Sequence, residues 1–168
     1  GPIDLVAAVT IGDDAIEVDF AGSSGMSSYA INCPLCYAEA YTTFGVNALI
    51  APDVPNNAGT LDAVRVTAPP GTIVNATHPA AVYARSVMGH MLPDVVYGAL
   101  DQAMPGRVPA EGTSNLWTLN LIAGHGLTGI GAKAGTAFMV NSFHSGGAGA
   151  RPAQDGLSAT PFPDRKST

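Results

Sequence analysis

Residues 32–50 read NCPLCYAEAYTTFGVNALI, and this stretch decides the fold. Asn32 is suited to cap the start of a helix, with Pro34 in the first turn. Apolar and small residues then recur at the spacing of one helix face, at Leu35, Ala38, Tyr41, Gly45, Ala48 and Leu49. Because this face consists largely of small residues, we expect the helix to lie close against a sheet.

The residues before this helix predict a β-hairpin. Apolar residues alternate with smaller ones over residues 5–11 and with acidic ones over residues 16–20. Gly12-Asp13-Asp14 between them is typical of a turn. The alternation indicates that one face of the hairpin is buried and the other is wet.

The residues after the helix predict a strand over 61–67, then a Pro69-Pro70-Gly71 turn that leads into residues 72–75. A second helix is expected from about Tyr83 to Met104. Pro93 lies inside it and removes a backbone donor, so we expect a kink or a break there.

Two further strands are expected over residues 115–122 and 136–143, joined by a glycine-rich connection, with a polar tail from about residue 157. The order of elements predicts an α+β fold, in which two main helices pack on one face of a mostly antiparallel sheet. We see no linker in the sequence, so we expect residues 1–168 to form a single domain.

Composition narrows the classes of function. With 46% hydrophobic residues, the 168-residue chain can build a sizeable core. The net charge is −6 and basic residues do not cluster, which argues against binding nucleic acid. Glycine, proline or polar residues interrupt every apolar stretch before the roughly 20 residues of a membrane span, so we expect a cytoplasmic chain without a membrane partner.

The motif Cys33-Pro34-Leu35-Cys36 allows two interpretations. At a helix N-terminus the backbone donors favour a thiolate, which would suit a small dithiol oxidoreductase. The interpretation that we prefer is a buried structural pair of thiols, because the preceding element is a hairpin and not the start of a βαβ unit. A zinc site is disfavoured because no second pair of ligands follows at a recognisable spacing.

His90 and Asp94 are candidates for catalysis. Their i, i+4 spacing would place an imidazole and a carboxylate on one helix face. Pro93 between them disturbs that geometry, and the alternative is a hydrogen bond on the helix surface.

Arg151 and Asp155 are candidates for substrate binding. They lie in the glycine-rich segment SGGAGARPAQDGLSAT at residues 145–160, whose backbone N–H groups could cradle an anion while Arg151 supplies a charge. The segment is not a nucleotide-binding phosphate loop, because the lysine and closing hydroxyl are absent. The alternative is that these residues only shape a turn.

Several segments in their order along the chain resemble the B subunit of the hydantoinase and oxoprolinase family. They read VDFAGSS at 18–24, INCPLC at 31–36, VPNNAGTLDAVRVTAPPGTIVN at 54–75, GHMLPDVVYGAL at 89–100, RVPAEGTSNLW at 107–117, and the glycine-rich segment above. The resemblance implies that the chain corresponds to the central portion of such a subunit.

The resemblance also implies a function: part of an ATP-dependent hydrolase that opens cyclic amides such as hydantoin or 5-oxoproline. The expected partners are a hydantoinase A-like subunit, which carries the ATP chemistry, and the remaining segments of the B subunit. ATP and a divalent metal are expected in the complete enzyme, with no cofactor held by this segment. The family's metal-binding strings, Asn-Asp-Pro-Tyr and Gly-Thr-His, do not occur here, so no metal ligand carries over.

Two alternatives to that function remain. Relatives in the family carboxylate ketones, so the chain could belong to an ATP-dependent ketone carboxylase. It could also be a non-catalytic scaffold or binding fragment that is inactive alone.

Overall fold

The computed structural model describes residues 1–112, 117–123, 138–144 and 146–158. Its elements are two small sheets and four helices, which confirms the α+β class. Across both sheets, two of the three strand pairs are antiparallel. The polar tail expected from about residue 157 lies mainly outside the described residues.

The first sheet has three strands in the order β1 (Ala8–Ile11), β2 (Ile16–Asp19) and β3 (Val64–Thr67). β1 and β2 form the expected hairpin, with Val9 opposite Val18. β3 joins β2 in parallel, with Val66 opposite Val18. The central strand thereby carries Val18 into the core, where it is fully buried.

The strand expected over residues 61–67 begins later than predicted. Residues 58–62 form the short helix α2 (Ala58–Asp62), and β3 follows it. The cause is a capping box at Asn57, whose side chain accepts from the backbone N–H groups of Gly59 and Thr60. The Thr60 hydroxyl oxygen in turn accepts a hydrogen bond from the N–H of Asn57. These reciprocal bonds stabilise a helical turn here, so the strand starts only after it.

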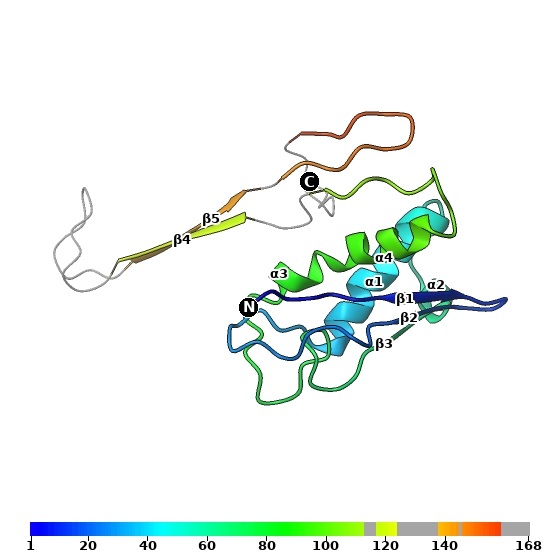
Figure 1. Ribbon diagram of the computed structural model, residues 1–168. Coiled ribbons are helices and arrows are strands. Elements are labelled where there is room, and N and C mark those ends of the chain that lie inside the picture. The colour runs from blue at the N-terminus through cyan, green and yellow to red at the C-terminus, as the bar shows by residue number, and fades with distance from the viewer. Residues whose placement is uncertain (113–116, 124–137, 145, 159–168) are drawn as a thin grey trace.

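Two main helices cover one face of this sheet, as expected (Figure 1). α1 (Leu35–Ile50) contacts β3, α4 (Leu92–Asp101) contacts β1, and the two helices pack against each other. Gly45 permits their close approach, because a Cβ atom on Gly45 would lie 3.0 Å from Cα of Pro93.

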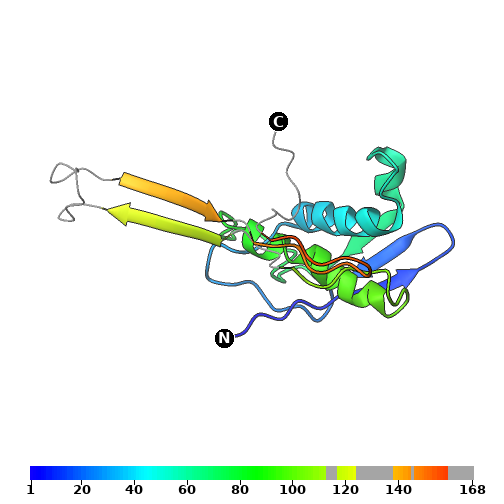
Figure 2. The same ribbon diagram turned by 90° about the horizontal axis from the view of Figure 1, so that it is seen from above.

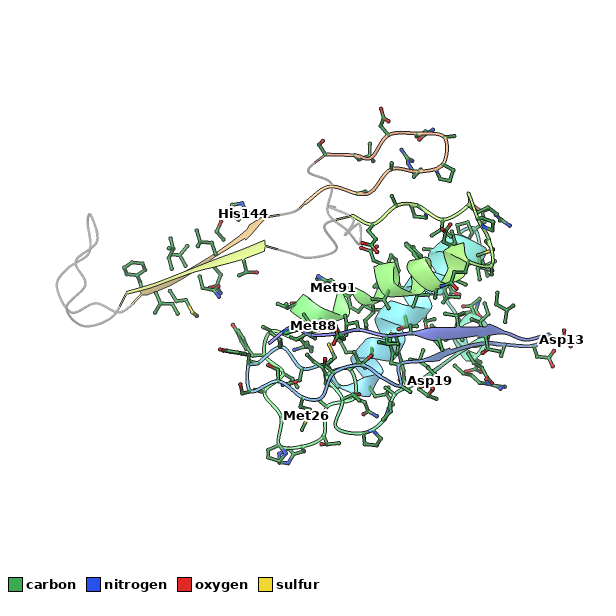
Figure 3. All side chains as sticks on the ribbon, in the orientation of Figure 1. Asp13, Asp19, Met26, Met88, Met91 and His144 are labelled. Carbon is green, nitrogen blue, oxygen red and sulfur yellow. The ribbon has the colours of Figure 1, made fainter. Side chains whose placement is uncertain are left out.

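The expected helix from Tyr83 to Met104 is interrupted. It consists of α3 (Ser86–Gly89) and α4, and the break falls just before Pro93, which lies in the first turn of α4. Met88 and Met91 mark the two sides of the break in Figure 3. Proline is tolerated in a first helical turn because its missing N–H has no intrahelical acceptor there.

The prediction that Asn32 caps α1 is wrong. α1 begins after Pro34 without a side-chain cap. The Asn32 side chain instead accepts from Ser27 N–H at 2.7 Å and donates to the carbonyl oxygens of Tyr29 and Ala81 at 3.0 and 2.9 Å. A buried amide that ties together distant loops satisfies its hydrogen-bonding groups better than a cap would.

The core lies between the first sheet and the two main helices. Its fully buried apolar side chains include Val18, Phe20, Val46, Ile73, Val74, Leu92, Val96 and Leu100. Residues 72–75, which follow the predicted turn, place Ile73 and Val74 in this core. None of the helices in the described ranges is both long and apolar enough to cross a bilayer.

The second sheet is a hairpin of β4 (Trp117–Ala123) and β5 (Phe138–His144). It lies within one or two residues of the two strands predicted from the sequence. The hairpin extends away from the rest of the structure, as Figures 1 and 2 both show. The predicted glycine-rich connection between the strands lies outside the described residues.

Candidate functional site

Asp94 is a carboxyl group held inside the structure. It lies in the first turn of α4 and is 9% exposed. A helix N-terminus favours a carboxylate, but burial favours the neutral acid. Burial dominates here, since it raises the pKa of Asp94 from 3.8 to about 6.

Two neighbours adjust that pKa in opposite directions. The charge of Glu111 raises the pKa of Asp94 further, whereas a hydrogen bond from the backbone of Gly112 lowers it. Tyr97, one turn later in α4, is also buried, and burial together with the Asp94 charge raises the pKa of its hydroxyl. Asp94 can therefore change protonation state near neutral pH, which is the property needed of an acid or base group.

Asp94 opens into a cavity of about 250 Å³. The wall is formed by α4, by residues that follow it and by the glycine-rich segment: Asp94, Tyr97, Pro109, Ala110, Gly112, Ala148, Gly149, Arg151 and Leu157. Most of this surface is apolar or backbone. A small apolar cavity with a few polar groups is typical of a site for a small molecule.

The glycine-rich segment closes the cavity by packing backbone against backbone. Ala110 N–H donates to the carbonyl oxygen of Ala150 at 2.8 Å, and Ala148 N–H donates to that of Leu157 at 2.9 Å. A Cβ atom on Gly149 would collide with the carbonyl of Ala110. The glycines are therefore needed for close approach.

Arg151 and Asp155 take different positions. Arg151 contributes to the cavity wall, and its backbone pairs with Gln154 in a turn. Asp155 is exposed and is absent from the residues that line the cavity. The structure thus brings Arg151 together with Asp94, a combination that the sequence did not indicate.

His90 lies outside this cavity wall. It ends α3, is fully buried, and its Nε2 atom lies 2.8 Å from the Tyr41 hydroxyl in α1. The two rings are tilted, with centroids 5.0 Å apart. His90 and Asp94 do not share one continuous helix face, because the break between α3 and α4 separates them.

Cys33 and Cys36 have unlike surroundings, so the prediction of a buried pair is wrong for Cys36. Cys33 is buried and donates through Sγ to the Arg85 carbonyl oxygen at 3.1 Å, whereas Cys36 is exposed; neither forms a disulfide. Burial raises the pKa of Cys33 to about 11. The thiolate expected of a dithiol oxidoreductase is therefore disfavoured at Cys33.

The other described histidines are exposed. His78 lies in a loop, and His144 in β5 contacts the Ser142 hydroxyl at 2.9 Å, at the position labelled in Figure 3. His125 lies outside the described residues. Within the described ranges, no three His, Cys, Asp or Glu side chains gather as a metal-binding group.

Sequence reasoning missed Tyr97, Ala110 and Gly112 as parts of the cavity. The i, i+3 spacing of Asp94 and Tyr97 was a usable signal, since it places both side chains on one helix face. The approach of residues 110–112 to the glycine-rich segment had no local signal in the sequence.

Comparison with known proteins places the chain among relatives of known family. The family model described as hydantoinase B/oxoprolinase matches residues 1–167. An uncharacterized protein of Methanocaldococcus jannaschii is 32% identical over 125 residues, which are 74% of this chain and 22% of that protein. The B subunit of a putative D-/L-hydantoinase from a Pseudomonas species is 31% identical over 122 residues, or 67% of this chain and 20% of the relative.

Two solved structures share the fold. The ATP-dependent caprolactamase of Pseudomonas jessenii matches with a TM-score of 0.69 and 28% identity, over 92% of this chain and 26% of that one. A nucleotide-free acetone carboxylase matches with a TM-score of 0.71 and 19% identity, over 92% of this chain and 21% of the other, which shows the fold alone. This chain thus spans about a fifth of the curated relatives, and it belongs to the hydantoinase B/oxoprolinase family.

Proposed function

We propose that the chain is part of the B subunit of an ATP-dependent enzyme that opens cyclic amides. The observation that carries the proposal is the match of residues 1–167 to the hydantoinase B/oxoprolinase family. The similarity to a caprolactamase supports the same class, because a caprolactam is also a cyclic amide. Hydantoins, 5-oxoproline and simple lactams are therefore the candidate substrates.

In this proposal the chemistry is divided between polypeptides. A hydantoinase A-like subunit would use ATP to activate the amide oxygen, and the B subunit would complete the hydrolysis. Residues of the B subunit outside this segment would hold the divalent metal expected in the complete enzyme. Activation is needed because an unactivated amide is a poor electrophile. This segment contributes scaffold, part of the interface and one wall of a substrate site in a cytoplasmic complex.

Asp94 and Arg151 are the residues that we assign to that wall. Asp94 is buried and has a pKa of about 6, so it can hold or release a proton at physiological pH. Arg151 lines the same cavity and offers a charge for an anionic substituent. His90 is assigned a supporting role through its contact with Tyr41.

The runner-up is an ATP-dependent ketone carboxylase. Its support is the fold of the acetone carboxylase. We rank ring opening first because the 28% identity to the caprolactamase exceeds the 19% identity to the carboxylase.

The test is reconstitution of the complete B subunit with its A-like partner. Hydantoin, 5-oxoproline and ε-caprolactam would be supplied with ATP, and ring-opened product and ADP would be measured together. Ring opening that requires both subunits and ATP supports the proposal. Bicarbonate-dependent use of acetone without ring opening would favour the carboxylase. If neither activity is found, the scaffold role is favoured.

A further inference from the structure

The cavity beside Asp94 has the size of a single ring. Its volume is about 250 Å³, and a cavity of roughly 150 Å³ is known to hold benzene. Ligands of drug size need roughly 300–1,000 Å³. The cavity therefore suits a ring of five to seven atoms with at most a small substituent.

The cavity wall offers one main polar side chain that such a ring could contact. Pro109, Ala110 and Gly149 present apolar or backbone surface, and the buried Asp94 carboxyl supplies the polar group. The Gly112 backbone bond occupies one of its acceptor positions. An ionised carboxylate has about four such positions, and the protonated acid has one O–H donor together with the remaining acceptor positions, so positions are left for a ligand in both states.

The acidic groups beside Asp94 disfavour a negative charge placed directly against its carboxyl. Glu111 adds a negative charge, the Tyr97 hydroxyl is buried beside Asp94, and Arg151 is the cationic residue of the wall. A neutral ligand avoids the cost of burying an unpaired charge near these groups.

A cyclic amide in a small ring matches a carboxyl group at two points. The ring forces the amide into the cis form, so its N–H and C=O lie on the same side. The N–H can donate to one carboxyl oxygen while the C=O accepts from the O–H on the other. An open-chain secondary amide prefers trans by about 2.5–4 kcal/mol, and its two groups then point in opposite directions.

We infer that Asp94 recognises neutral small-ring lactams by a two-point hydrogen bond inside this cavity. The inference rests on the proposed function and specifies its substrate class. The protonated acid makes both bonds and the carboxylate makes only the bond from the lactam N–H. Loss of the second bond weakens binding about fivefold, which corresponds to about 1 kcal/mol for a neutral hydrogen bond.

The test measures binding of 2-pyrrolidinone to the 168-residue chain by calorimetry or NMR titration at pH 5 and pH 8. N-ethylacetamide is the open-chain control, and N-methyl-2-pyrrolidinone is the control without a donor. We expect 2-pyrrolidinone to bind more tightly than either control, and about fivefold more weakly at pH 8 than at pH 5. Equal binding of all three compounds, or no binding of 2-pyrrolidinone at millimolar concentration, would overturn the inference.

Three variants separate recognition from folding. Asp94→Asn keeps one donor and one acceptor, so it should bind 2-pyrrolidinone equally at both pH values. Asp94→Leu should lose at least tenfold in affinity, and Asp101→Asn, an exposed change in the same helix, should behave like the natural chain. Binding to Asp94→Asn that keeps the pH dependence of the natural chain would contradict the inference.

The inference and the proposed function can fail separately. Lactam binding without ATP-dependent ring opening in the reconstituted enzyme would leave the inference standing and remove the function. Ring opening by the reconstituted enzyme that is unchanged by Asp94→Leu would support the proposed function and contradict the inference about Asp94.

Discussion

Gly149 of the glycine-rich segment lies so close to the carbonyl of Ala110 that no side chain fits between them. The adjacent Ala150 carbonyl oxygen accepts a hydrogen bond from Ala110 N–H at 2.8 Å. This contact joins residues far apart in the sequence and closes the cavity over Asp94. The integrity of the cavity therefore depends on the absence of a side chain at Gly149.

Gly149→Ala should detach the glycine-rich segment from residues 110–112. The added methyl group must displace backbone, which typically costs about 1–3 kcal/mol. We expect faster amide exchange at Ala110 and weaker binding of 2-pyrrolidinone, as measured by hydrogen exchange and calorimetry.

Gly98→Ala is the matched control. Its Cβ would meet nothing within 4 Å on the exposed side of α4. Alanine is favoured over glycine in a helix by about 1 kcal/mol, so this variant should be slightly more stable and should keep the cavity. Normal amide protection at Ala110 in Gly149→Ala would contradict the proposed role of the contact.

The buried carboxyl of Asp94 should make stability depend on pH. Its pKa is raised from 3.8 to about 6 in the folded chain, so below the lower value both folded and unfolded states are protonated. Between the two values the folded chain keeps a proton that the unfolded chain has released. The contribution of Asp94 to the free energy of unfolding therefore falls as pH rises from about 4 to about 6, and it stays low above that.

Asp94→Asn removes this titration because the amide is neutral throughout. Urea unfolding of the natural chain and the variant between pH 4 and pH 8 should show the variant gaining relative stability as pH rises. Gly98→Ala, on the exposed side of the same helix, carries no titratable group and should change stability by an amount that does not depend on pH. A difference in the free energy of unfolding between Asp94→Asn and the natural chain that does not change with pH would show that folding does not raise the pKa of Asp94.

The two cysteines should differ in reactivity and in their importance for stability. Iodoacetamide should modify exposed Cys36 readily and buried Cys33 only on unfolding, because the thiolate is the reactive form and burial raises the pKa of Cys33 to about 11. Cys33→Ser should cost about 1–3 kcal/mol by burying a hydroxyl. Cys36→Ser should change stability by less than about 0.5 kcal/mol. Rapid formation of a Cys33–Cys36 disulfide under mild oxidation would restore the dithiol interpretation.

The helix α1 and the first hairpin were predictable because their signals are local. Helical spacing from Leu35 to Leu49 and alternation on either side of Gly12 both follow from side chains a few residues apart. The break before Pro93 was predictable for the same reason, since a proline disrupts the turn that precedes it.

The parallel pairing of β3 with β2 and the cavity beside Asp94 were not predictable from local signals. Val18 and Val66 meet across the sheet although α1 and α2 lie between them in the chain. Asp94 and Arg151 likewise come together only when the glycine-rich segment packs onto residues 110–112. The cap predicted at Asn32 was wrong because the same short polar side chain serves equally well as a helix cap or as a tie between loops.

The projecting hairpin of β4 and β5 should contribute exposed apolar surface that binds hydrophobic dyes and promotes self-association. Leu121 lies opposite Val140, and both are 50% exposed. The strand period of two places Leu119 and Phe138 on the same face, so an apolar strip is exposed. Replacing Leu121 and Val140 together by threonine keeps strand propensity and should lower both the binding of a hydrophobic dye and self-association in sedimentation, with stability changed by about 0.5 kcal/mol or less. Replacing Asn120 and Asn141 by threonine alters the opposite face of the hairpin and should leave dye binding unchanged. Equal dye binding by both double variants would show that the apolar strip is not the surface to which the dye binds.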